Sequence, residues 1–133
     1  MPEARFLTAD DVLAIAAEFF AALGYARPVL RGGGRELLEV AVHRAQAFAF
    51  YGPADLYAQA AALAGGTAQS QAFVDGSKRV AFAACVVFLR ANGHPLVGDA
   101  HDDLADKIIG LPTFPGRSAA EEDLARWLSD HTD

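Results

Sequence analysis

Residues 71–79 carry side chains of the types that bind a phosphate group. They read Gln-Ala-Phe-Val-Asp-Gly-Ser-Lys-Arg and run directly into an apolar stretch. Gly76 lets the backbone come close to a ligand, because glycine has no Cβ. Lys78 and Arg79 add two cations, and Asp75 adds a hard oxygen ligand of the kind that Mg²⁺ takes when it also holds nucleotide phosphates. The chemistry of this chain is therefore expected in this segment.

The apolar stretch at residues 80–89 predicts the helix that positions these side chains. It is too short to span a bilayer, which needs about 20 apolar residues, so it predicts a buried core helix that ends at Asn92 and Gly93. Because it is apolar on every side, we expect it to be the central helix of the domain. Its N-terminus would bind anions through free N–H groups and the helix dipole. Phe73 would anchor the preceding loop in the core.

Residue types alone leave two interpretations of this segment open. One is a phosphate site, and the other is a capped helix start with solvated cations. The loop and the helix together resemble the motif of the Fic/Doc superfamily, in particular the Doc (death-on-curing) toxins. Their pattern is His-x-Phe-x-Asp-Gly-Asn-Lys-Arg, followed by a helix that ends near Phe-Leu-x-x-Asn-Gly. The residues that fit are Phe73, Asp75, Gly76, Lys78, Arg79, Phe88, Leu89, Asn92 and Gly93.

Two positions depart from the pattern of the family. Gln71 stands where the family has its catalytic histidine, and Ser77 stands where it has asparagine. In the family that histidine is the general base, which takes the proton from a hydroxyl on the target protein. A glutamine amide cannot do this near neutral pH, and a general base contributes roughly 10²–10⁴-fold, so we expect impaired catalysis with binding retained. The Ser77 hydroxyl can still face a phosphate or cap the helix.

The resemblance implies a fold, a reaction and partners. It implies a toxin of a type II toxin–antitoxin system that uses ATP and Mg²⁺ to phosphorylate a hydroxyl of a translation elongation factor. Lys78 favours this kinase-like reaction, because the Fic enzymes that transfer AMP carry a second glycine at that position. The antitoxin is expected to be a small, partly disordered protein whose helix docks in an apolar groove. The implied roles are catalytic for Gln71, Lys78 and Arg79, phosphate-binding for Gly76, Ser77, Lys78 and Arg79, and metal-binding for Asp75.

Two other functions stay open beside the impaired toxin. One is a non-catalytic member of the family that binds nucleotide, antitoxin or a protein target, and the other is a helical interaction domain without a nucleotide role. No other histidine is expected to replace the base. We interpret His43 as a partly buried structural residue, His94 as a turn residue, and His101 and His131 as solvated residues in acidic segments.

Composition bounds the class of protein. A chain of 133 residues that is 53% hydrophobic predicts a single domain over residues 1–133. The helical pattern along the chain and the resemblance imply a compact, Fic/Doc-like all-α bundle of about six helices around a buried central helix. A net charge of −6 argues against general nucleic-acid binding. The N-terminus lacks the basic and apolar regions of a signal peptide, so we expect a cytoplasmic protein with no membrane partner. The lone Cys85 is expected to be buried and inert.

Helix signals place the remaining elements. Thr8 is predicted to cap a helix that runs through Leu23, and further helices are predicted at about residues 36–50, 54–64 and 100–109. The last helix should begin at Ser118, with Glu121 completing a capping box. Gly65 and Gly66 are expected to turn the chain toward residues 71–79.

Three further segments have competing interpretations. The glycines at residues 32–34 predict a flexible connector, since a phosphate loop would need a preceding strand and a Gly-Lys-Ser/Thr ending. Residues 50–53 occupy the place of the family's flap, where the target docks, and are equally compatible with a simple turn. The acidic residues are expected to form a solvated helix face and not a metal site: Asp99, Asp102, Asp103 and Asp106.

Overall fold

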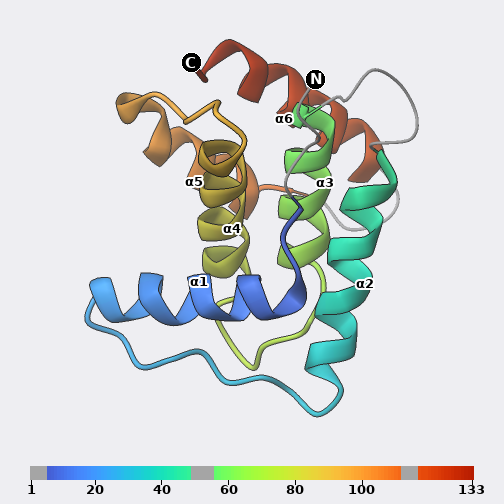
Figure 1. Cartoon of the computed structure of the whole chain (residues 1–133), viewed down its shortest axis with the longest axis vertical. Helices are drawn as coiled ribbons and strands as arrows, with labels where there is room; N and C mark the ends of the chain where they lie inside the picture. The colour runs from blue at the N-terminus through green and yellow to red at the C-terminus, as the bar shows by residue number, and fades with distance from the viewer. Residues whose placement is uncertain (1–5, 49–55, 112–116) are drawn as a thin grey trace.

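The computed structural model describes residues 6–48, 56–111 and 117–133, and in these ranges the chain forms six α-helices and no β-sheet (Figure 1). This confirms the predicted all-α bundle. A 3-10 turn, η2 (Gly98–Ala100), leads directly into the fifth helix. The helices are α1 (Ala9–Ala22), α2 (Gly34–Ala47), α3 (Leu56–Ala68), α4 (Ser77–Ala91), α5 (His101–Ile109) and α6 (Arg117–Asp130).

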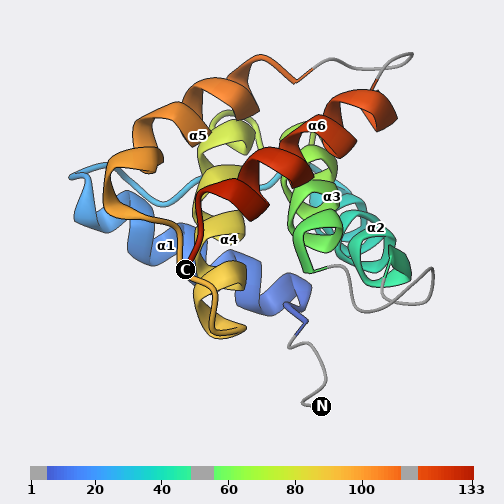
Figure 2. The ribbon, with the colours of Figure 1, turned by 90° about the horizontal axis from the view of Figure 1, so that it is seen from above.

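The helices α3 and α4 lie side by side in the middle of the bundle. The helix α2 packs on α3, α5 packs on α4, and α1 lies across the end at which α3 connects to α4 (Figure 1). Seen from above, α6 crosses over α3 (Figure 2). Buried side chains from all six helices join in one contiguous core, so the connection from α3 to α4 emerges from the centre of the molecule.

The most completely enclosed helix is α3, in which every residue from position 59 to 68 is buried. The predicted end at Ala64 and the turn at Gly65 and Gly66 are wrong, because both glycines lie inside the helix. A Cβ on Gly66 would come within 3.3 Å of the Cβ of Ala41 on α2, and one on Gly65 would overlap the carboxylate of Glu121 on α6. These glycines therefore permit close helix packing.

The helix α4 is buried along most of its length but not on every side. Val80, Cys85 and Leu89 are fully buried, whereas Phe82, Val86 and Val87 are only partly covered. The expectation of a helix enclosed on all sides is wrong at this flank, because α1 covers only part of it and leaves a groove between the two helices. The enclosed inner face still fixes the N-terminus of α4 in the core.

The helix α1 has well-defined signals at both ends. As predicted, Thr8 caps it: the backbone N–H of Asp11 donates to the Thr8 hydroxyl at 3.1 Å, and the Thr8 N–H donates to the Asp11 carboxylate at 2.9 Å. At the other end Gly24 has a φ of +81° and the N–H of Tyr25 donates to the Phe20 carbonyl at 2.8 Å. This is a Schellman turn, and it directs Tyr25 back toward the end of the helix.

The helix α2 begins at Gly34, two residues before the predicted start. Gly33 precedes it with a φ of +76°, and a Cβ on the buried Gly34 would overlap the carbonyl oxygen of Ala72. The interpretation of residues 32–34 as a flexible connector is therefore wrong. Glycine is needed here because the start of α2 is pressed against the loop that precedes α4.

An ion pair joins α2 to α6. The Arg44 guanidinium donates to both carboxylate oxygens of Glu121, at 2.7 and 3.2 Å, and Glu121 is only 5% exposed. Arg44 also approaches the Ala62 carbonyl of α3 at 3.4 Å, so it contacts three helices. The capping box predicted for Glu121 involves the side chain of Ser118, which lies outside the described part of the structure.

Candidate functional site

Residues 69–76 connect α3 to α4 and hold most of the predicted site. Ser70 starts the loop: its hydroxyl donates to the Thr67 carbonyl at 2.8 Å and accepts from the Ala72 N–H at 3.1 Å. The Gln69 amide donates to the Leu111 carbonyl at 3.0 Å. Phe73 is 2% exposed, which confirms the prediction that it anchors the loop in the core.

The loop pairs with the connection between α1 and α2. The N–H of Val74 donates to the Val29 carbonyl at 2.8 Å, and the N–H of Arg31 donates to the Ala72 carbonyl at 2.8 Å. The Arg31 side chain adds a bond from Nε to the Phe73 carbonyl at 3.1 Å. Residues 29–31 are thus the segment that lies beside the loop (Figure 1).

The predicted flap at residues 50–53 falls outside the described residues. Among the described residues, the segment that pairs with the loop is residues 29–31, in the connection between α1 and α2.

The N-terminus of α4 presents free backbone donors. Gly76 is its N-cap with a φ of +91°, and a Cβ there would lie 2.8 Å from Cζ of Phe20. The N–H of Val80 makes the first bond of the helix, to the Gly76 carbonyl at 3.0 Å. Among the described residues no acceptor faces the N–H groups of Ser77, Lys78 and Arg79. These donors and the helix dipole make the end of α4 electropositive.

The charged side chains at this end point to two sides. The ammonium of Lys78 donates to the carbonyl of Ile109, the last residue of α5, at 3.0 Å. Asp75 and Arg79 instead line a hollow of about 350 Å³ that also includes Tyr25. Asp75 is exposed and has no hydrogen-bond or ion-pair partner within the described ranges. The structure therefore brings Asp75 and Arg79 together and separates Lys78 from them.

Gln71 is exposed and has an unusual backbone conformation. Its φ is +58°, which no other non-glycine residue in the described part of the chain shares. A long L side chain occupies this left-handed region only at a cost, and such outliers concentrate at functional sites. The residue at the base position is thus accessible to solvent on the loop, with a side chain that carries no titratable base.

The histidines differ in part from the predictions made for them. His43 is exposed rather than partly buried, because it lies on the outer face of α2. His101 and His131 are half-buried rather than solvated, because each packs near a helix end: the Nδ1 atoms lie 3.0 Å from the Gly98 carbonyl and 2.7 Å from the Trp127 carbonyl, respectively. His94 is exposed in the turn after α4, as predicted. None of them belongs to residues 69–76.

The side chains at the N-terminal end of α4 could hold one hard cation, such as Mg²⁺, only if a bound phosphate supplied further oxygen ligands. In the described part of the chain no group of three or more acidic, histidine or cysteine side chains could hold a metal ion. Asp75 is a single exposed carboxylate beside an electropositive helix end. Mg²⁺ is commonly held by one or two carboxylates with phosphate oxygens and water, so Asp75 fits that role.

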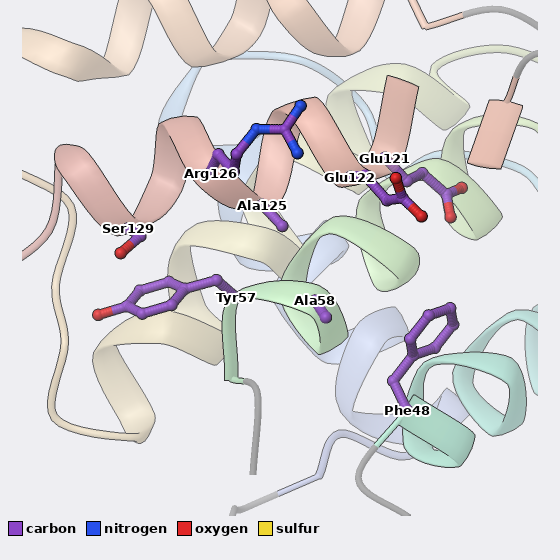
Figure 3. A pocket seen from close by; sticks show the side chains of 8 residues that line it. All are labelled: Phe48, Tyr57, Ala58, Glu121, Glu122, Ala125, Arg126 and Ser129. Carbon is purple, nitrogen blue, oxygen red and sulfur yellow. The ribbon is translucent and has the colours of Figure 1, made fainter. Parts of the chain in front are cut away.

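Two other hollows lie away from the loop. One, of about 680 Å³, runs between α1 and α4 and is lined mainly by apolar side chains such as Phe19, Phe82 and Val86. The other, of about 580 Å³, lies between the N-terminal end of α3 and α6, with Tyr57 and Phe48 at its edge (Figure 3). Neither is lined by residues 69–79.

In the described ranges, no helix has both the length and the apolar character needed to cross a membrane.

Several residues that shape the site were not identified from the sequence. Arg31 donates hydrogen bonds to the Ala72 and Phe73 carbonyls of the loop, and Gly34 packs against the Ala72 carbonyl. Phe20 and Tyr25 flank the N-terminus of α4. A local signal existed for two of these positions. The glycines at residues 32–34 mark a backbone approach, and Gly24 marks the turn that directs Tyr25. The contacts of these residues with the loop and with the N-terminus of α4 are long-range in sequence, so local patterns do not predict them.

Comparison with known proteins identifies the family of this chain. Residues 6–89 match the model of the Fic/DOC family, a stretch that contains α1 to α3, the whole of the loop and α4 as far as Leu89. Over 75 residues the chain is 41% identical to Toxin Doc of Mycolicibacterium smegmatis, an alignment that covers 55% of this chain and 58% of that protein. The chain thus spans little more than half the length of this relative. The family match covers more than half of the chain, and the chain belongs to the Fic/DOC family.

Proposed function

We propose that this protein is a Doc-like toxin of a type II toxin–antitoxin pair that binds the phosphates of ATP at the N-terminus of α4. The observation that carries the proposal is the free N–H groups of residues 77–79 behind the left-handed Gly76, within a chain of the Fic/DOC family. Helix N-termini of this form bind phosphate through backbone donors and the dipole. Similarity to Toxin Doc supports the assignment to the toxin class.

The residues of the site divide the work of phosphate transfer. Backbone N–H groups of Ser77 and Lys78 would hold phosphate oxygens, and the Arg79 guanidinium would add charge and paired donors. Asp75 would bind Mg²⁺, which neutralises charge on the phosphates when bound. Lys78 donates to the Ile109 carbonyl, so its ammonium reaches a phosphate only after it leaves that carbonyl. Phosphoryl transfer depends mainly on such positioning and charge stabilisation.

Gln71 is the weak point of the proposed reaction. A target hydroxyl that approaches the exposed position 71 meets an amide, which cannot accept its proton near neutral pH. We therefore propose transfer that is slower by roughly 10²–10⁴-fold than with a histidine base. Ser77 places a hydroxyl at the start of α4, where the family has asparagine, and leaves the backbone donors in place.

The proposed partners are those expected of a Doc-like toxin. We propose a cognate antitoxin as the regulatory partner and a translation elongation factor as the target of transfer, with no nucleic-acid partner for a chain of net charge −6. The second candidate function is a non-catalytic Fic-fold protein that binds nucleotide, antitoxin or a protein target without turnover. The exposed amide at position 71 favours this candidate over a fully active enzyme.

The test compares the natural chain with Gln71→His, and uses Gln71→Asn as a control that keeps an amide. Calorimetry with ATP·Mg²⁺ should give similar dissociation constants for all three, because the phosphate-binding groups are unchanged. Radiolabelled transfer to a bacterial lysate should rise by roughly 10²–10⁴-fold for Gln71→His alone. Its expression should also arrest growth, and co-expression of the antitoxin should relieve that arrest.

Each other outcome of this test has a defined meaning. Transfer by the natural chain at the rate of Gln71→His would overturn the impairment. Binding by every form without transfer by any would favour the non-catalytic function. Absence of ATP binding in all three would overturn the phosphate site itself.

A further inference from the structure

Arg79, unlike Lys78, lines the hollow beside Asp75 and has no hydrogen-bond or ion-pair partner among the described residues. Within the described residues its one interaction is with an aromatic ring. Its guanidinium carbon lies 4.8 Å from the centroid of the Tyr25 ring. A guanidinium that stacks by its face keeps the N–H donors at its edge available. Those donors match the oxygens of a phosphate in pairs.

Tyr25 is itself held in place by the end of α1. The Schellman turn at Gly24 ties the N–H of Tyr25 to the Phe20 carbonyl at 2.8 Å. The rings of Phe20 and Tyr25 then meet edge to face, with centroids 6.3 Å apart. Phe20 is 5% exposed, so the ring of Tyr25 rests on a fixed part of the core.

The same phenylalanine also sets the N-terminus of α4. Cζ of Phe20 lies so close to Gly76 that a Cβ on that residue would be only 2.8 Å away. One aromatic pair, Phe20 and Tyr25, therefore contacts both the N-cap of α4 and the guanidinium three residues further on. The backbone donors and the arginine edge are thereby positioned by a common support at the C-terminal end of α1.

We propose that Tyr25 is a positioning residue, which holds the Arg79 guanidinium over its ring so that the free edge meets phosphate oxygens bound at the N-terminus of α4. This inference rests on the phosphate site of the proposed function. Without the ring, Arg79 would sample many rotamers in solvent, and each phosphate would bind at the cost of ordering it. Tyr25 would therefore affect the affinity for phosphates and not the affinity for a nucleoside.

The experiment measures the binding of ATP·Mg²⁺, ADP and adenosine by calorimetry to the natural chain and to Tyr25→Leu and Tyr25→Trp. Cation–π contacts of exposed to partly desolvated arginines predict that Tyr25→Leu weakens ATP binding by about 2- to 30-fold. Tyr25→Trp should bind ATP at least as tightly as the natural chain, since tryptophan is the best cation–π partner. Adenosine binding should not change. Tyr25→Ser is a second variant without a ring, for use if the leucine variant does not fold.

A thermodynamic cycle with Arg79→Ala separates positioning from a general structural role. In the Arg79→Ala background, Tyr25→Leu should have no further effect on ATP binding, because the group that it positions is gone. An equal loss in both backgrounds, or unchanged ATP binding by Tyr25→Leu, would overturn this inference and leave the phosphate site standing. A natural chain that binds no ATP would overturn the proposed function and this inference together.

Discussion

Gly76 and Gln71 both have a positive φ, but the two residues differ in what surrounds them. Gly76 has a φ of +91° and also lies against Phe20, so glycine is required there for conformation and for space. Gln71 has a φ of +58° with an exposed side chain, so only conformation opposes its side chain. The loop therefore holds one position at which glycine is necessary and one at which a longer residue persists under strain.

Replacement of Gln71 by glycine should stabilise the protein. The left-handed conformation costs an L residue about 1–2 kcal/mol, and the extra chain entropy of glycine offsets about 0.5–1 kcal/mol of that, so we expect a net gain of about 0.5–1 kcal/mol. Urea denaturation measures the change. The control is Ala14→Gly at an exposed position in the middle of α1, which should destabilise by about 1 kcal/mol. Equal losses for both variants would show that position 71 is not strained.

At the scale of elements, one polar contact joins helices that are distant in sequence. Arg44 of α2 and Glu121 of α6 meet beside α3, where Gly65 leaves room for the carboxylate. Glu121 is almost fully buried and Arg44 is partly exposed, with side-chain exposures of 6% and 29%. Such a pair specifies how α6 sits on the bundle, because a buried carboxylate without its partner is strongly unfavourable.

Removal of either partner of this ion pair should destabilise the bundle. We expect about 3 kcal/mol for Arg44→Met or Glu121→Leu, near the low end of the range for buried pairs because Arg44 keeps some solvent contact. The double variant should lose much less than the sum. Denaturation curves of the four proteins give the coupling energy. Arg126→Ala is the matched control, since Arg126 pairs with Asp123 at the surface, and it should cost less than about 1 kcal/mol. Additive single effects would contradict the coupling.

On the scale of the whole molecule, the core shields the thiol of Cys85, the one cysteine of the sequence, from solvent. Cys85 is fully buried on α4, and burial raises the pKa of the thiol from 9.0 to about 12. The folded state thus favours the neutral thiol more than the unfolded state does. This contribution to stability is complete below pH 9, and it is lost as the pH rises from about 9 to about 12.

Cys85 should react with a thiol reagent at pH 8 only through opening of the core. The rate should follow the population of the unfolded state and rise steeply with added urea. Ser129→Cys provides an exposed thiol on α6 as the control, and it should react quickly without urea. Rapid modification of Cys85 in the absence of urea would contradict a closed core.

The raised pKa also predicts how stability changes with pH. The difference in the free energy of unfolding between the natural chain and Cys85→Ala should shrink above pH 9.

The sequence determined the helical character of the chain and the residues of the loop. Local signals suffice for these features: Thr8 and Asp11 are three residues apart, Gly24 ends α1, and residues 71–79 are continuous. Each of these contacts involves groups close together along the chain, which patterns and propensities describe well.

Only the tertiary structure decided how these parts meet. Gly65 and Gly66 look like a turn by composition, yet they continue α3 because α2 and α6 press against them. Residues 32–34 look flexible, yet Gly34 is buried against the loop. The same holds for the pairing of Arg31 with Phe73 and of Tyr25 with Arg79. These outcomes depend on the close approach of backbones and side chains that are far apart in sequence, and packing, unlike local preference, is fixed only when the whole core is assembled.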